Sequence, residues 1–146
     1  KASMSIRIED MRYEHTEQFI EDQYPVDIRY KLKIESRVTK DGEFIDFLRG
    51  FKRRKKKLNH GRSLSFYIEE NTTPTNLQNY SVKWKILNRG EEAKRRKCIR
   101  GQIIWDNGNK RIEEYSSFNG EHLVECYIIQ NGVVVARDRI HVPIED

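Results

Sequence analysis

Charged and polar side chains recur in strand-like segments between Trp84 and Pro143, where hydrophobic periodicity indicates that the strands are half buried. In WKILNRGEEA (84–93), IRGQIIWDNGNKRIEEYSSF (99–118) and HLVECYIIQNGVVVARDRI (122–140), Glu, Arg and His alternate with residues typical of a hydrophobic core. A charged group in a half-buried strand needs a partner, either in the protein or in a ligand. We therefore expect any functional site to lie in this part of the chain.

Several polar residues in these segments are candidates for ligand binding. Some of them follow the strand that contains Trp84, where the chain turns toward a short helix, and loops at strand ends commonly carry binding residues. The candidates are Asn88, Arg89, Glu92, Arg100, His122, Glu125 and Arg137. An asparagine before a helix is equally typical of an N-cap, and a single histidine at a strand start more often only forms a hydrogen bond.

The charges around Glu125 have a second interpretation. The dipeptide Asn131-Gly132 predicts a two-residue hairpin turn, and this register places Glu125 directly opposite Asp138. Like charges opposed on a sheet destabilise it by roughly 0.2–1 kcal/mol, so we expect an arginine between them. The nearest candidates are Arg100, Arg137 and Arg139. The cluster is either a buried ion network, which we favour slightly, or a polar pocket prearranged for a ligand.

The run KRRKKK accounts for the net charge of +5. Its residues are Lys52, Arg53, Arg54, Lys55, Lys56 and Lys57. They have the composition of a contact to nucleic acid or to another anionic surface. Only Phe51 and His60 flank the run and no aromatic residue interrupts it, which favours a solvated loop between two strands. Binding that weakens with salt would favour the first interpretation.

Catalytic and metal motifs are absent from the sequence. No serine or cysteine can be matched with a base and an orienting acid, and there is no glycine-rich phosphate loop. Cys98 and Cys126 indicate neither a disulfide framework nor a zinc site. We therefore expect no enzyme activity, no cofactor and no metal. Because no long apolar run or secretory signal occurs, we expect a cytoplasmic protein without a membrane partner.

The elements that position these residues are predicted to be mostly strands. The most regular alternation of apolar and charged residues runs from Val26 to Ile34, which is typical of a strand with one solvent-exposed face. Similar alternation occurs at 63–68 and at 80–87, where Trp84 is expected in the core. Residues 42–50 fit either a short strand or a single helical turn.

Turn and helix signals separate these strands. Asn107-Gly108 and Asn131-Gly132 each predict a tight hairpin. Residues 71–79 are expected to form a loop, because Pro74 is excluded from a central strand. Residues 91–97 are the best helix candidate, since acids occupy the first turn and bases the last.

Together these signals predict an all-β fold, an antiparallel immunoglobulin-like β-sandwich of about seven to eight strands with one short helix. We assign residues 23–146 to the sandwich. Residues 1–22 have weak periodicity and are expected to be a linker or a peripheral segment that packs on a neighbouring domain. The residues Lys1-Ala2-Ser3 before Met4 suggest that the sequence is part of a longer polypeptide.

Residues 24–144 resemble a known family, the adenylyl/guanylyl cyclase and SMODS C-terminal sensor domain, or AGS-C. The segments that carry the resemblance are Tyr24-Pro25, SLSFYIEE (63–70), VKWKILNRGEEA (82–93), IRGQI (99–103), SFNGEHLVECYIIQNGVVVARDRI (117–140) and VPI (142–144). The lysine-rich segment 50–62 departs from the family pattern.

The resemblance implies a noncatalytic sensor at the C-terminal end of a bacterial anti-phage enzyme of the CBASS-like or cyclase type. Its expected partner is a catalytic nucleotidyltransferase or cyclase domain in the same chain or operon. Its expected ligand is an infection cue or a nucleotide. The Gly-Ser and spaced Asp residues of that catalytic domain are absent here. Two alternatives stay open: a nucleic-acid-binding module that uses residues 52–57, and a protein-interaction module that assembles the parent enzyme.

Overall fold

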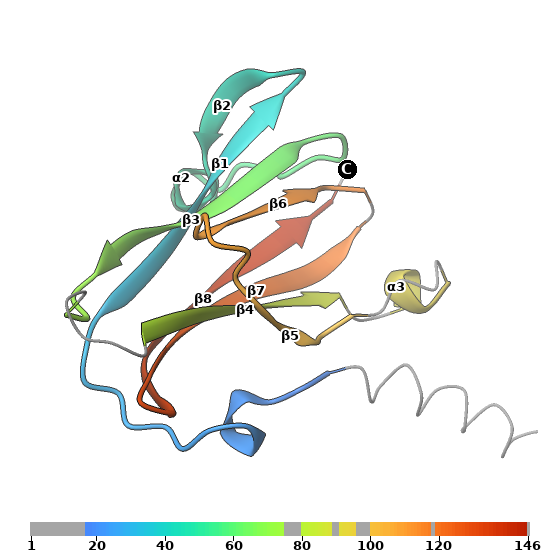
Figure 1. Cartoon of the computed structure of the whole chain (residues 1–146). Coiled ribbons are helices and arrows are strands. Elements are labelled where there is room, and N and C mark those ends of the chain that lie inside the picture. Colours follow the sequence, from blue (N-terminus) through green and yellow to red (C-terminus); the bar gives the residue numbers. More distant parts are fainter. Residues whose placement is uncertain (1–16, 75–79, 89–90, 96–99, 118, 146) are drawn as a thin grey trace, which may run out of the picture.

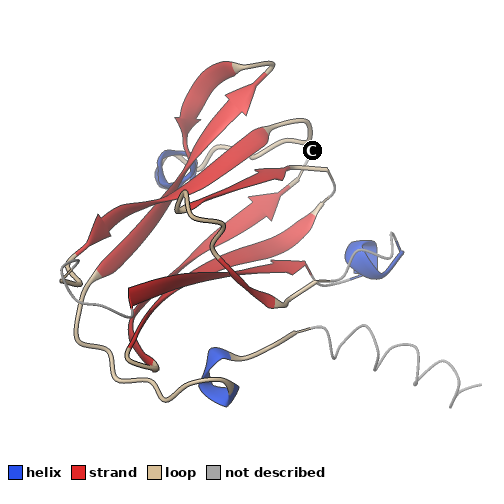
Figure 2. Ribbon diagram, in the orientation of Figure 1, coloured by secondary structure: helices blue, strands red, loops and turns tan. Residues whose placement is uncertain are grey.

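The computed structural model describes residues 17–74, 80–88, 91–95, 100–117 and 119–145. In these ranges eight strands form two antiparallel sheets that pack face to face (Figures 1 and 2), which confirms the predicted β-sandwich. The elements in chain order are the 3-10 helix η1 (Ile20–Asp22), β1 (Leu32–Lys40), β2 (Glu43–Phe47), α2 (Leu48–Arg53), β3 (Ser63–Asn71), β4 (Tyr80–Asn88), α3 (Glu91–Arg95), β5 (Ile103–Trp105), β6 (Arg111–Tyr115), β7 (Gly120–Gln130) and β8 (Val133–Ile144).

The first sheet has the strand order β2-β1-β3-β6, and the second has the order β5-β4-β7-β8. The core lies between them because alternate residues of each strand point inward. Trp84 on β4 is completely buried, as predicted, and its indole Nε1 donates a hydrogen bond to Asp106 over 2.9 Å. Leu48 and Phe51 of α2 belong to the same core, so this short helix closes one end of the sandwich.

The predicted strand from Val26 is wrong at its start, because β1 begins only at Leu32. Residues 26–30 instead run along β8. Val26 forms a single parallel bridge with Val134, and the Asp27 amide donates to the Val134 carbonyl over 2.9 Å. The alternation of apolar and charged residues therefore begins at Val26, in a connecting segment before the strand itself. Residues 42–50 were predicted to be either a short strand or a helical turn, and they contain both, since β2 leads directly into α2.

The two Asn-Gly pairs behave differently. Asn131 and Gly132 have φ angles of 51° and 74°, and they form the predicted tight turn between β7 and β8. Asn107-Gly108 does not form a hairpin, because β5 and β6 belong to different sheets. The Asp106 carboxylate accepts hydrogen bonds from the Gly108 and Lys110 amides over 2.8 and 3.0 Å and shapes this crossover instead.

A register shift in the β7–β8 hairpin overturns the predicted pairing of Glu125. Ile129 pairs with Val134 as predicted, but an irregularity follows between Ile128 and Ile129, and Glu125 then pairs with Arg139. An extra residue in one strand changes the face of every residue beyond it. The predicted pairing of Glu125 with Asp138 is therefore wrong, and Glu125 lies opposite the cation of Arg139.

Candidate ligand pocket and the covered outer face

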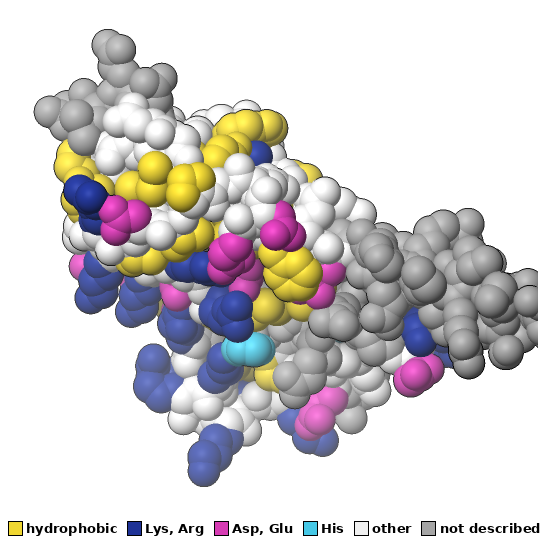
Figure 3. Space-filling model, turned by 90° about the horizontal axis from the view of Figure 1, so that it is seen from below, with side chains coloured by type: hydrophobic (Ala, Val, Ile, Leu, Met, Phe, Trp, Pro, Cys, Tyr) yellow, Lys and Arg dark blue, Asp and Glu magenta, His cyan; other side chains and the backbone are white. Residues whose placement is uncertain are grey.

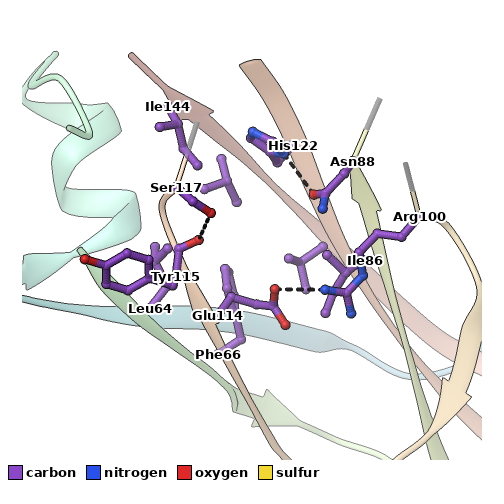
Figure 4. A pocket seen from close by; sticks show the side chains of 12 residues that line it. Leu64, Phe66, Ile86, Asn88, Arg100, Glu114, Tyr115, Ser117, His122 and Ile144 are labelled. Carbon is purple, nitrogen blue, oxygen red and sulfur yellow. Dashed lines mark hydrogen bonds and ion pairs between the residues drawn. The ribbon is translucent and has the colours of Figure 1, made fainter. Parts of the chain in front are cut away.

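A pocket of about 480 Å³ opens between the two sheets, with β3 and β6 on one side and β4, β7 and β8 on the other (Figure 4). Its walls are mostly apolar. The apolar lining residues are Leu64, Phe66, Ile86, Val124, Val142 and Ile144. Its polar lining residues are Asn88, Arg100, Glu114, Tyr115, Ser117 and His122. A small-molecule site typically has this composition, an apolar cavity with a few converging polar groups.

Asn88 and His122 face each other at the pocket. They occupy paired positions at the end of β4 and the start of β7, and both share the inward face of their strands with core residues. His122 Nδ1 lies 2.9 Å from Asn88 Oδ1 (Figure 4). Because an amide oxygen only accepts hydrogen bonds, Nδ1 is the donor and the imidazole orientation is fixed.

Arg100 reaches from the edge of the second sheet across to the first. Its backbone forms an isolated antiparallel bridge with Asn88, with N–O distances of 3.0 and 3.2 Å. Its guanidinium donates to Glu114 Oε1 on β6 over 3.1 Å. Burial raises the pKa of the Glu114 carboxyl, and the neighbouring Arg100 offsets only part of this effect. The pair therefore spans the gap between the sheets beside Asn88 and His122.

The raised pKa of Glu114 predicts a pH-dependent stability. In the range just above the ordinary glutamate pKa, the folded protein still holds a proton that the unfolded chain has lost. The free energy of unfolding contributed by this group should therefore fall as the pH rises through that range. Urea unfolding at a series of pH values should show this fall in the wild type relative to Glu114→Gln. Parallel pH profiles would contradict a buried carboxyl at this position.

Three predicted residues are brought together at the pocket, and Glu114 was missed. Its signal was in the sequence, since Ile112 and Glu114 alternate in RIEEY and both belong on the inward face of β6. Glu92 does not line the pocket; it accepts hydrogen bonds from Arg95 within α3. Arg89 lies outside the described residues.

Glu125 and Arg137 lie on the opposite, outer face of the second sheet. Residues 17–24, here called the N-terminal strap, cross this face below β4 and β5 (Figure 1). Ile20 of the strap is buried against Tyr127 and Ile129 of β7. The strap explains why outward-pointing side chains of this sheet are buried.

The strap and the sheet are joined by alternating charges. Lys85 Nζ lies 3.0 Å from Glu17 of the strap and 4.0 Å from Glu125, and Glu125 pairs with Arg139 over 2.6 Å. Glu125 also accepts a hydrogen bond from the Tyr127 hydroxyl. Figure 3, which views this side of the molecule, shows acidic and basic side chains next to each other with hydrophobic ones between them.

Arg137 belongs to the same outer network. It pairs with Glu21 of the strap over 2.9 Å, and its guanidinium lies 5.5 Å from the centre of the Tyr127 ring. This contact lowers the pKa of Glu21, chiefly through the hydrogen bond from Arg137. Glu125 is therefore buried among ion pairs and Arg137 forms a more exposed pair beside it, while Asn88, Arg100 and His122 line a pocket on the other face.

Comparison with known proteins identifies the family of the chain. The family model for the Adenylyl/Guanylyl and SMODS C-terminal sensor domain matches residues 14–145. The chain belongs to this family. This AGS-C domain is also similar to the "Cytidylate cyclase" of Staphylococcus aureus, with 28% identity over 67 residues. That alignment covers 45% of the AGS-C domain and 16% of the relative, so the chain spans a small part of that protein.

The family assignment makes the AGS-C domain a sensor domain of cyclase-like proteins. Its described residues contain no cluster of His, Cys, Asp and Glu that could hold a metal ion. Burial raises the pKa of the Cys126 thiol well above its usual value, which keeps the thiol protonated and unreactive. No helix within the described ranges is long and apolar enough to cross a membrane.

The basic run of the AGS-C domain is not simply a loop, because α2 extends to Arg53. Arg54 pairs with Asp46 of β2, and Lys57 lies 3.8 Å from Glu145. The side chains of the run are exposed and lie outside the pocket between the sheets. The run and the pocket are therefore separate features.

Proposed function

We propose that this AGS-C domain senses a small ligand of the nucleotide type in the pocket between its two sheets. The observation that carries the proposal is the convergence of Asn88, Arg100 and His122, from three separate chain segments, at the mouth of an apolar cavity of about 480 Å³. This volume lies within the range typical of small-molecule sites. The fold thus assembles polar groups that the sequence places far apart.

The pocket chemistry suits a nucleobase joined to an anionic group. Phe66 and Ile86 provide apolar surface for a ring, and the Asn88 amide carries both donors and an acceptor that match base edges. The Arg100 guanidinium has five N–H groups, and Glu114 accepts from one of its nitrogens. An entering phosphate would compete with Glu114 for this cation.

The same site has a short structural route to the rest of the parent enzyme. Gly101 follows Arg100 directly, and its carbonyl accepts a hydrogen bond from the Gln18 amide over 2.9 Å. Gln18 Oε1 in turn accepts from the Ile103 amide over 2.7 Å. A ligand that moves Arg100 would therefore act on the strap. We propose that the strap passes this change to a catalytic nucleotidyltransferase or cyclase domain, in the same chain or in the same operon.

In this proposal the ligand is a cue that appears during infection, and the parent enzyme is part of a bacterial anti-phage system. The similarity to the "Cytidylate cyclase" of Staphylococcus aureus supports a cyclase as the parent enzyme. In this proposal the domain binds the cue, and the catalytic step belongs to the parent enzyme.

Isothermal titration calorimetry with a panel of nucleoside 5′-phosphates and 3′,5′-cyclic nucleotides tests the proposal. At least one member should bind the wild type, and Asn88→Ala should weaken that binding roughly tenfold, because a buried polar group of the ligand loses its partner. Asn59→Ala is the matched control, since Asn59 is exposed and is not a lining residue. No binding of any nucleotide, or equal affinity in Asn88→Ala, would contradict the proposal.

A further inference from the structure

Strand β2 exposes two large aromatic side chains. Strand β2 is the outermost strand of the first sheet (Figure 1), and the side chains of Phe44 and Phe47 are 44% and 37% exposed. Phe47 lies opposite Arg37 of β1 in the strand register. The centres of the Phe44 and Phe47 rings are 5.1 Å apart in an edge-to-face arrangement. Edge strands normally carry charges or are covered, so two exposed phenylalanines on one edge indicate a binding surface.

Arg37 adds a cation to these rings. Its guanidinium carbon lies 4.4 Å from the centre of the Phe44 ring and 5.9 Å from that of Phe47. In the described part of the chain, no carboxylate forms an ion pair with Arg37. Aromatic rings and guanidinium planes are the two surfaces on which unpaired nucleobases stack.

The end of α2 brings further cations to the same corner. Arg54 pairs with Asp46 of β2 and holds the end of the helix against the strand. Gly50 makes this contact possible, since a Cβ there would lie 2.6 Å from Asp46 Oδ1 and 2.7 Å from Arg54 Nη1. Phe47 precedes α2 directly, so at 1.5 Å per residue Lys52 begins roughly 8 Å along the helix from Phe47.

Three cations of this corner remain available for phosphates. Lys52, Arg53 and Lys55 are exposed, and within the described ranges none of them pairs with an acid. We propose that the corner formed by Arg37, Phe44, Phe47, Lys52, Arg53 and Lys55 binds single-stranded nucleic acid, with bases stacked on the β2 rings and phosphates on the basic residues. The sequence contains no aromatic residue within the basic run, and the fold supplies the rings from β2.

A membrane surface is a poorer partner for this corner. Membrane-bound amphipathic helices insert an apolar face, but Leu48 and Phe51 of α2 are already buried in the core. The helix therefore presents only its polar side. The combination of stacked rings and separate cations is typical of single-strand binding, in which stacking supplements phosphate contacts.

Fluorescence anisotropy with a labelled oligouridylate tests this proposal over a series of KCl concentrations. Binding should weaken with salt, and the triple variant Lys52→Ala, Arg53→Ala, Lys55→Ala should reduce the log–log salt slope by about 2, since each phosphate contact contributes about 0.7. Phe44→Ala should weaken binding about 5- to 100-fold without changing the slope. Thermal unfolding confirms that each variant is folded.

A matched control removes three other exposed cations. Arg29→Ala, Lys31→Ala, Lys33→Ala makes the same charge change, but these side chains already pair with Asp27, Glu70 and Glu69. This control should bind the oligouridylate with nearly wild-type affinity. The proposal is overturned if the wild type does not bind at low salt or if the control loses as much affinity. Equal binding by Phe44→Ala, or preferential binding to phosphatidylserine vesicles, overturns it as well.

Discussion

Replacing Glu125 with alanine is expected to lower the free energy of unfolding by about 1–3 kcal/mol, because buried polar groups that contact its carboxylate each lose a partner. Glu125 is only 4% exposed and connects Lys85, Arg139 and the Tyr127 hydroxyl. Lys85 is buried to a similar degree and would lose one of its two carboxylate neighbours among the described residues, while Glu17 stays 3.0 Å away. Urea unfolding followed by circular dichroism measures the change.

Glu21→Ala is the control for this prediction. Glu21 belongs to the same outer network, but its side chain is 56% exposed, so its ion pair with Arg137 should contribute at most about 1 kcal/mol. A stable Glu125→Ala variant that no longer binds its ligand would contradict this structural role, because it would show that Glu125 recognises ligand and is not needed to stabilise the ion pairs of the second sheet.

Replacing Gly101 with alanine is expected to release the N-terminal strap. A Cβ at this position would lie 2.8 Å from the Glu17 Cα and 3.1 Å from Leu87 Cδ1, so the strap would have to move. The Gln18 and Ile103 amides, whose hydrogen bonds join strap and sheet, should then exchange with deuterium at least about tenfold faster, while the core strands keep their protection.

Gly108→Ala provides the control for Gly101→Ala. It is the same chemical change in the crossover between β5 and β6, where a Cβ would meet nothing within 4 Å. It strains the backbone locally, because the φ angle of Gly108 is 107°, but it should not accelerate exchange in the strap. Equal exchange rates in Gly101→Ala and the wild type would remove the proposed route from Arg100 to the parent enzyme.

Much of the fold and part of the site could be predicted from the sequence. Period-two alternation identified β3 and β4 on either side of the pocket, and Asn131-Gly132 identified the hairpin of β7 and β8. Asn88 and His122 were both candidates, and antiparallel pairing of β4 with β7 brings them together. Arg100 lies beside them because its backbone forms an isolated antiparallel bridge with Asn88.

The rest could not be predicted, for two physical reasons. A bulge leaves no mark in an alternating sequence, yet it moves Asp138 away from Glu125 and replaces it with Arg139. Asp138 instead contacts Arg49 over 3.0 Å. The second reason is that the strap has no clear periodicity, so its position over the outer face around Glu125 could not be predicted from the sequence.

The boundary between residues 1–22 and 23–146 stays a prediction, although residues 17–22 contact the second sheet in the structure. The alternative of a protein-interaction module also stays a prediction. The sequence alone could not separate a ligand-binding domain from a protein-interaction module, because exposed and covered charges give the same alternating pattern in a strand.

Ligand binding between the two sheets is tested most directly by nuclear magnetic resonance. Titration of the isotopically labelled chain with the tightest nucleotide from the calorimetric panel should first perturb the amides around Asn88, Arg100, Glu114 and His122. Gln18 should follow, because its amide bonds to Gly101. Perturbations confined to residues 52–57, or to the outer face around Glu125, would show that the pocket is not the binding site.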